Sequence, residues 1–178
     1  MRLLSRLGRE TSASQIAEAA LVLPIVFTLL LGIFWVGRAM NVQATINQAA
    51  RQGARAAVTA KCATCGNSPL TVDQVAAQVG AALQASRLDP SLVVPNTSTT
   101  YPTCAIGAAS CQTPTAGPNV PQICMYSNVQ LNQALSGPSS APPACGVVVT
   151  FQYKYPLTLP LGPQLIPLTA ESQTEGEN

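Results

Sequence analysis

The chain has 178 residues, of which 47% are hydrophobic, 9% charged and 4% aromatic. An ordinary cytosolic enzyme has about a quarter of its residues charged, so this composition is not typical of that class. The net charge of +2 comes from nine basic and seven acidic residues, which form no basic patch for nucleic acid. Because histidine is absent, Ser/His/Asp and Cys/His catalysis and histidine-bound zinc are excluded.

The first predicted element is an apolar helix that begins near the N-terminus. Ala19–Gly37 contains no charged residue and lies between Glu18 and Arg38. As a helix this segment is about 28 Å long, close to the roughly 30 Å of a bilayer's hydrocarbon core, so it can span a membrane. Three arginines precede it (Arg2, Arg6 and Arg9) and three follow within about twenty residues (Arg38, Arg51 and Arg55), so charge alone sets no orientation. The cysteines suit an oxidising compartment and Trp35 suits an interface, which places the N-terminus in the cytoplasm and residues 38 onward outside.

An alternative for this segment is a secretory signal peptide cleaved after Ala44. The apolar core of such a peptide normally has about 7 to 15 residues, and Ala19–Gly37 is longer. Its N-terminal region also contains two acids, Glu10 and Glu18. The membrane anchor is therefore the preferred interpretation.

The helix is expected to continue to about Ala60, because no proline occurs between Ala39 and Ala60. One stripe is apolar, and the opposite face is polar. The apolar stripe consists of Val42, Ile46, Ala49, Gly53 and Ala57, and the polar face of Gln48, Arg51, Gln52 and Arg55. Ala49, Gly53 and Ala57 form a row of small residues that permits close approach of another backbone. Gly53 weakens a helix by about 1 kcal/mol relative to alanine, so it is either a packing position or a tolerated glycine.

The remainder predicts a small α+β domain. Thr71 and Gln74 have capping-box spacing and open a helix to about Arg87, with Val72, Val75, Val79 and Leu83 facing inward. Short strands are expected at 92–94 and 123–126. The clearest strand is 146–155, in which alternate residues are apolar or aromatic, and its expected partner is 166–173. The loop expected to join these two strands is 156–163.

All six cysteines follow residue 60, as do all fifteen prolines except Pro24, which indicates a loop-rich, disulfide-linked region. The simplest pairing closes three local loops: Cys62 with Cys65, Cys104 with Cys111, and Cys124 with Cys145. A C-x-x-C pair is also found in redox sites and zinc sites. The spacing of the later cysteines does not complete a zinc ribbon, and no strand precedes Cys62, so structural disulfides are preferred. No nucleotide-binding or nucleophile motif and no paired acid and base occur, so no cofactor, metal or small-molecule substrate is expected.

Glu18 is an acid at the edge of an apolar span, where a charge costs free energy of membrane insertion. An acid at such a position indicates a functional role. It follows a basic leader and the sequence Ala13-Ser14-Gln-Ile-Ala. This pattern resembles a type IV prepilin signal, which implies that a prepilin peptidase cuts between Ala13 and Ser14. Glu18 then becomes the fifth residue of the mature chain, and Ala13 stands where such leaders usually have glycine. The resemblance further implies that the Glu18 carboxylate meets the new α-amino group of a neighbouring subunit.

A narrower resemblance follows from the whole helix. The segments Glu18–Pro24, Leu31–Phe34, Gly37–Ala39 and Asn47–Ala57 are similar to the TadE-like family of pilus-assembly pseudopilins. This implies a non-catalytic minor subunit of the tight-adherence (Flp) pilus machine in the bacterial inner membrane, with other pilin-like subunits as partners. The expected layout is a leader over 1–13, a long helix over 14–60 with its membrane part at 19–37, and an extracytoplasmic domain over 61–178.

Two other interpretations stay open from the residues. The chain could be a membrane-anchored extracytoplasmic binding or adhesion module unrelated to pili, in which case the leader is not cut after Ala13. It could also be a membrane-tethered thiol oxidoreductase that uses Cys62 and Cys65, in which case that pair is readily reduced.

Overall fold

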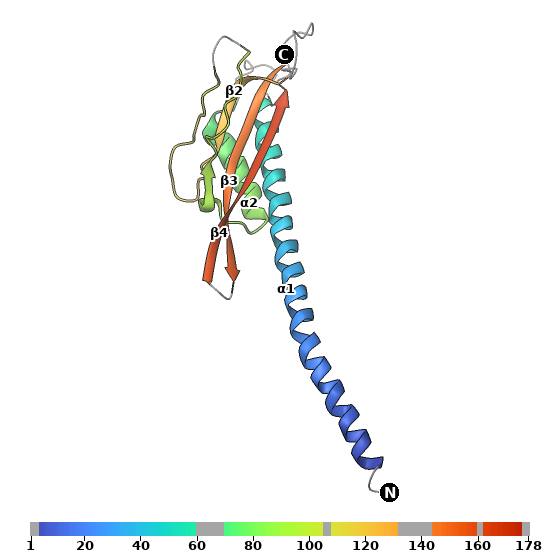
Figure 1. Ribbon diagram of the computed structural model, residues 1–178. Coiled ribbons are helices and arrows are strands. Elements are labelled where there is room, and N and C mark those ends of the chain that lie inside the picture. Colours follow the sequence, from blue (N-terminus) through green and yellow to red (C-terminus); the bar gives the residue numbers. More distant parts are fainter. Residues whose placement is uncertain (1–3, 60–69, 105–107, 132–143, 160–161, 176–178) are drawn as a thin grey trace, which may run out of the picture. The chain divides into compact units, whose positions relative to one another are not determined.

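A computed structural model describes residues 4–59, 70–104, 108–131, 144–159 and 162–175 (Figure 1). The elements are the helices α1 (Leu4–Val58) and α2 (Val72–Ala85), the 3₁₀ turn η1 (Pro90–Leu92), and the strands β1 (Val93–Pro95), β2 (Cys124–Gln130), β3 (Cys145–Leu159) and β4 (Gly162–Glu175). The expected α+β class is confirmed. The chain forms two compact units, residues 1–41 and 42–178, which we call the helical unit and the globular unit.

The helical unit consists of α1 up to Asn41 and exposes its apolar side chains. Leu21, Ile33, Phe34 and Val36, for example, are all at least 60% exposed. The helix continues through Pro24, and the Thr28 hydroxyl donates a hydrogen bond of 2.9 Å to the Ile25 carbonyl oxygen. Pro24 has no N–H for the Ala20 carbonyl oxygen, which is a different group from the one that Thr28 bonds. Membrane helices nevertheless tolerate proline more readily than helices in water.

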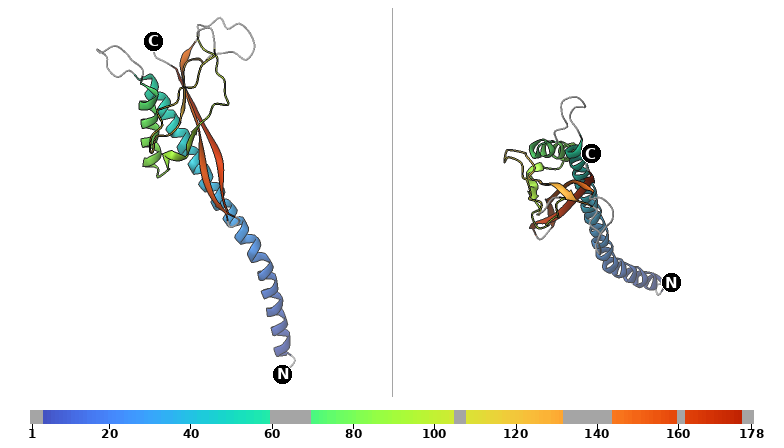
Figure 2. Two further views of the ribbon diagram at one scale, coloured as in Figure 1. Left: turned by 90° about the vertical axis from the view of Figure 1, so that its left-hand side faces the viewer. Right: turned by 90° about the horizontal axis from the view of Figure 1, so that it is seen from above.

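In the globular unit, the rest of α1 buries the apolar stripe that its sequence predicts. Val42, Ile46, Ala49, Gly53 and Ala57 are all buried, whereas the polar face is exposed. The neighbour of this stripe is α2, which lies alongside it (Figure 2). The expected amphipathic continuation of the helix is therefore confirmed, although it ends at Val58 rather than Ala60.

Helix α2 begins and ends close to its expected positions. The Thr71 N–H donates to Gln74 Oε1 at 3.2 Å, which closes the backbone arm of the capping box. Val75, Val79 and Leu83 are fully buried, and Val72 is half-buried. The helix ends at Ala85, and Arg87 then adopts a positive φ of 59° that turns the chain away from the helix.

β3 is the central strand of an antiparallel sheet. β1 and β2 pair with one side of it and β4 pairs with the other. Val149, Phe151, Tyr153 and Tyr155 lie on one face, and all four are buried. Gly53 of α1 lies against Val149, so this face packs on the helices. The predicted strand and its partner are confirmed.

The predicted loop at 156–163 is wrong, because the two strands continue through it. β3 extends to Leu159 and β4 begins at Gly162, with Pro156 opposite Leu165 and Thr158 opposite Pro163. Proline is tolerated here because β1 and β2 pair only with earlier residues of β3, which leaves one edge without a partner in the described strands. Proline content alone was a poor guide to the end of this strand.

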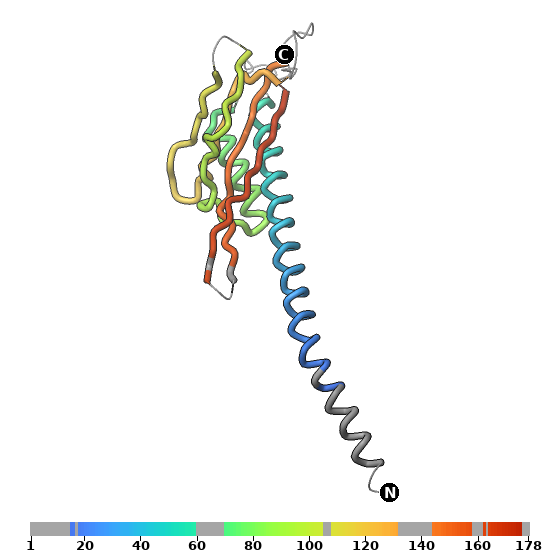
Figure 3. Tube along the Cα trace, viewed as in Figure 1, coloured from blue at the N-terminus to red at the C-terminus, as the bar shows by residue number. Residues whose placement is uncertain are grey.

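The segment between β1 and β2 runs antiparallel along the outer edge of β2 (Figure 3), and its Tyr101 packs on the face of the sheet away from the helices. Gln112 and Met125 exchange two backbone hydrogen bonds of 2.9 Å, and the Cys104 N–H donates to the Asn128 carbonyl oxygen at 2.9 Å. Tyr101 packs edge-to-face on Tyr126, with ring centroids 4.7 Å apart. The described part of the globular unit therefore has helices on one face of the sheet, and a segment along the edge of β2 that covers part of the other face.

Candidate functional site: apolar helix and cross-linked globular unit

The strongest functional feature is the apolar surface of α1. A candidate membrane span begins at Glu18, and its most apolar 18-residue window has a mean hydropathy of 2.6. None of that window is buried, which is the opposite of a core helix in a soluble protein. A single long apolar helix with this exposure fits a single-pass membrane anchor.

The residues implied in processing lie at the start of this helix. Glu18 is exposed and directly precedes the uncharged segment. Ala13 and Ser14 also lie within α1, but their side chains are outside the described part. Ser14 and Glu18 are four positions apart in one helix, so their backbone positions share a helix face.

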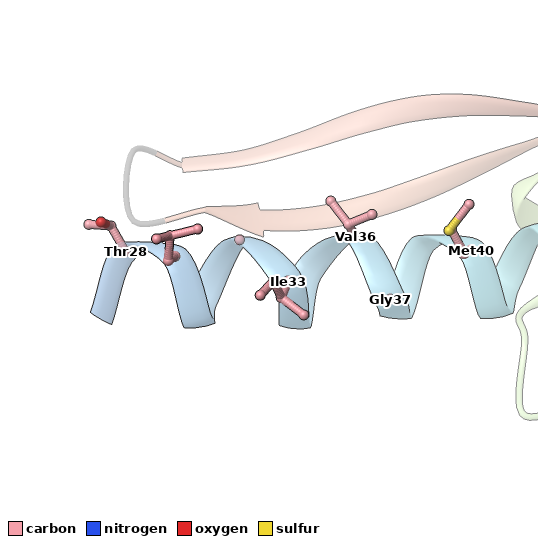
Figure 4. Close-up of a pocket in the computed structure, with 7 residues that line it drawn as sticks. Thr28, Ile33, Val36, Gly37 and Met40 are labelled. Carbon is pink, nitrogen blue, oxygen red and sulfur yellow. The ribbon is translucent and has the colours of Figure 1, made fainter. Parts of the chain in front are cut away.

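A shallow apolar groove runs along the helical unit (Figure 4). Its lining residues are Thr28, Leu29, Gly32, Ile33, Val36, Gly37 and Met40. A Cβ built at Gly32 or Gly37 meets no atom within 4 Å, so both glycines leave backbone exposed. Sequence reasoning did not single out this groove, although two glycines in an otherwise apolar helix are a recognisable signal for close helix approach.

The second row of small residues is occupied within the chain itself. A Cβ built at Gly53 would lie 2.6 Å from Val79 Cγ2 and 3.5 Å from Val75 Cγ1, both on α2. Ala49 and Ala57 are each 1% exposed. Gly53 thus has a packing role, and the element that approaches it is α2 of the same chain.

Two disulfides tie the loop layer to the sheet. Cys104 bonds Cys145 and Cys111 bonds Cys124, with Cα–Cα distances of 6.0 and 5.3 Å. The expected pairs Cys104–Cys111 and Cys124–Cys145 are therefore wrong. The reason is the antiparallel course of the loop along β2, which carries Cys104 toward the Gln130–Cys145 pair and Cys111 toward the start of β2.

The remaining expected pair, Cys62 with Cys65, lies outside the described residues. The thiol oxidoreductase interpretation depends on these two cysteines alone. Within residues 4–59, 70–104, 108–131, 144–159 and 162–175, no three His, Cys, Asp or Glu side chains are grouped so as to hold a metal ion.

The perturbed ionisable groups of the globular unit have structural explanations. Burial, followed by the nearby Glu171 carboxylate, raises the pKa of Tyr101 above its ordinary value. The Ser91 hydroxyl and N–H both donate to Asp89 Oδ1, at 2.7 and 2.9 Å, and lower the pKa of that carboxyl. Tyr101 belongs to an apolar cluster on the loop side of the sheet, and Asp89 caps η1. These shifts follow from packing and capping.

Comparison with known proteins finds a family match that lies within α1. Residues 13–55 match the family described as TadE-like protein. No curated protein and no solved structure matches the chain. The matched segment includes Glu18, the apolar groove and Gly53, and it coincides with the part of the sequence that carries the resemblance. Over residues 13–55, about a quarter of its length, this chain is therefore similar to the TadE-like family.

Proposed function

We propose that this protein is a pseudopilin of a tight-adherence (Flp-type) pilus, needed for pilus assembly and without catalytic activity. The observation that carries the proposal is the overlap of the TadE-like match with a candidate membrane span that begins at Glu18 and whose most apolar 18-residue window has no buried residue. The family is associated with such pili, and the match brings no enzymatic activity with it.

The proposal places residues 19–37 in the bacterial inner membrane, with residues 1–13 as a cytoplasmic leader and the globular unit on the extracytoplasmic side. The disulfides Cys104–Cys145 and Cys111–Cys124 support the oxidising side. A prepilin peptidase removes the leader between Ala13 and Ser14, and other pilin-like subunits are the partners. The exposed groove around Gly32 and Gly37 supports contact with a second apolar helix.

The decisive measurement of processing is the N-terminus of the protein isolated from its own membranes. Mass spectrometry is expected to find Ser14 as the first residue. Intact Met1 would favour a membrane-anchored binding module unrelated to pili, and a start at Thr45 would establish a secretory signal peptide.

The role of Glu18 is tested by Glu18→Ala. Removing a charge from the edge of the span leaves membrane insertion intact, whereas a partner cation in lipid loses its counter-charge, so pili are expected to be absent. Membrane level and cleavage state are measured alongside piliation. Glu10→Ala is the matched control, because this acid lies in the leader and is removed by cleavage. Normal piliation in Glu18→Ala, with normal protein level, would refute an assembly role for the carboxylate.

A further inference from the structure

The far end of the β3–β4 hairpin is an exposed apolar surface that the assembly proposal does not use. We call residues 156–159 and 162–168 the hairpin tip. The chain has no charged residue between Tyr155 and Ala170. Leu165 is 60% exposed and Ile166 is 39% exposed. Sheet edges in water usually carry charged side chains that prevent association, and the hairpin tip has none.

The register of the sheet shows which backbone groups of the hairpin tip point outward. The backbone N–H and carbonyl of Met125 form hydrogen bonds with Gln112, on the side of β2 away from β3. Val149, which lies opposite Met125 on β3, therefore directs its own backbone groups toward β4. Backbone groups alternate in direction along an antiparallel strand. The Thr169 carbonyl oxygen fits this alternation, because it points outward and accepts a hydrogen bond of 2.8 Å from Gln43 Nε2.

The same alternation directs the backbone nitrogens at positions 156, 158, 163, 165 and 167 of the hairpin tip away from the β3–β4 ladder. Pro156, Pro163 and Pro167 occupy three of these positions, and proline has no N–H. An outward N–H without a partner is satisfied by water but is costly in lipid. The prolines therefore remove most of the donors that would oppose transfer of this edge out of water.

The hairpin tip projects from the end of the globular unit at which α1 enters. Gly53 lies against Val149, and ten residues earlier Gln43 bonds Thr169, so β4 follows α1 back toward Val42. From Thr169 to Gly162 the strand runs a further seven residues, about 23 Å at roughly 3.3 Å per residue. Within the globular unit, Figure 1 shows the hairpin extending past α2 in this direction.

The covalent chain limits the distance between Val42, the first residue of the globular unit, and the apolar segment. Val42 follows Gly37 by five residues, which span at most about 17 Å even when fully extended. The hairpin extends about 23 Å beyond Thr169, which is more than the roughly 17 Å that can separate Val42 from Gly37. We propose that the hairpin tip contacts the lipid bilayer in which the apolar helix is anchored, with Leu165 and Ile166 in the interfacial region. This inference rests on the membrane anchoring in the proposed function.

Tryptophan fluorescence tests the contact, because Trp35 is the single tryptophan of the chain. The full chain is reconstituted in phosphatidylcholine vesicles with or without lipids brominated on the upper acyl chain. In a Trp35→Phe background, Leu165→Trp is expected to be blue-shifted and to lose most of its emission to bromine. Gln173→Trp is the matched control: it is exposed on the same face of β4, eight residues farther from the tip, and its emission is expected to be unaffected. Ile166→Trp provides a second reporter if Leu165→Trp does not fold.

The outcomes separate the anchor from the hairpin. Bromine quenching of Trp35 in the otherwise unaltered chain establishes the anchor. Quenched Trp35 with unquenched reporters at both 165 and 166 would overturn the hairpin contact and leave the anchor intact. A blue shift at 165 without bromine quenching would indicate contact with protein and would also overturn it. Unquenched Trp35 would overturn anchoring and hairpin contact together.

Discussion

Replacing Gly53 with alanine tests the packing of the globular unit most directly. The new Cβ would lie 2.6 Å from Val79 Cγ2, closer than real side chains approach, and Val79 is fully buried. Alanine gains about 1 kcal/mol of helix propensity over glycine. Overpacking a well-packed core costs about 1 to 3 kcal/mol. We expect a net destabilisation of about 1 kcal/mol, which lowers the melting temperature of the globular unit by about 4 °C.

A double-mutant cycle separates this clash from a general effect on the helix. Val79→Ala alone leaves a cavity and is expected to destabilise the unit by about 2 kcal/mol. Combined with Gly53→Ala, the new methyl group occupies part of that space, so the two effects are expected to be non-additive by about 1 kcal/mol. Near-UV circular dichroism of the full chain in detergent follows thermal unfolding.

Gly32→Ala is the control for the cycle, since a Cβ at Gly32 meets no atom within 4 Å. It is expected to leave the melting temperature of the globular unit unchanged. A Gly53→Ala variant as stable as the unmodified protein, or a strictly additive cycle, would refute close packing of Gly53 against α2.

Three further expectations concern the globular unit. Cys104→Ser opens a disulfide with a sequence separation of 41, and chain entropy predicts a loss of about 4 kcal/mol in the free energy of unfolding. Cys111→Ser opens one with a separation of 13, and the predicted loss is about 3 kcal/mol. Denaturant titrations measure both. Tyr126→Phe is expected to lose about 1 kcal/mol with its 3.0 Å hydrogen bond, whereas Tyr155→Phe is expected to be nearly neutral, because the Tyr155 hydroxyl has no hydrogen-bond partner in the described part of the chain. The pKa of Tyr101 is raised above 10.0, so above that pH the folded state retains a proton that the unfolded state releases. The stability contributed by this group is therefore present below pH 10 and falls above it. Tyr101→Phe is expected to reduce this alkaline loss of stability in melting experiments.

Periodic features of the sequence predicted most of the local structure. The buried stripe that includes Val42, Ile46 and Gly53 has helical spacing, and the alternation from Val149 to Tyr155 has strand spacing. Both patterns report on which face of one element is buried, and that property is encoded within a few consecutive turns or residues. The cap formed by Thr71 and Gln74 is equally local. The helices and the main hairpin could therefore be located without knowledge of the rest of the fold.

The disulfide pairing depended on contacts that sequence spacing does not contain. A local loop is the shortest closure, which predicts that Cys104 bonds Cys111. The loop instead runs antiparallel to β2, and this course is set by the Gln112–Met125 hydrogen bonds. Residues that are near in sequence are thereby carried to opposite ends of the strand. Such a course is decided by the sheet as a whole, so cysteine spacing alone could not establish it.

The length of the β3–β4 hairpin was missed for a different reason. Proline content predicts a loop, but the effect of a proline in a sheet depends on which way its nitrogen points. Pro156, Pro163 and Pro167 all fall on outward positions of the register. Pro163 and Pro167 are four residues apart on β4, and an even spacing within one strand keeps the same direction. Pro156 lies on β3, seven residues before Pro163, and in this register an odd spacing across the turn also keeps the outward direction. A proline at an inward position would have removed a hydrogen bond of the ladder.

The row of small residues in α1 limits which helix face is available for the proposed contacts with other subunits. The sequence left open whether Gly53 receives a neighbouring backbone or is merely tolerated, and α2 of the same chain now lies against it. A helix face already packed on its own domain is not available to a second chain without unfolding that domain. Gly32 and Gly37, in contrast, have open space around them. If the proposed assembly role holds, glycine-mediated contacts of the described part of α1 with another subunit are expected in the apolar segment. Close backbone packing is favourable there, because lipid offers little hydrophobic driving force for helix association.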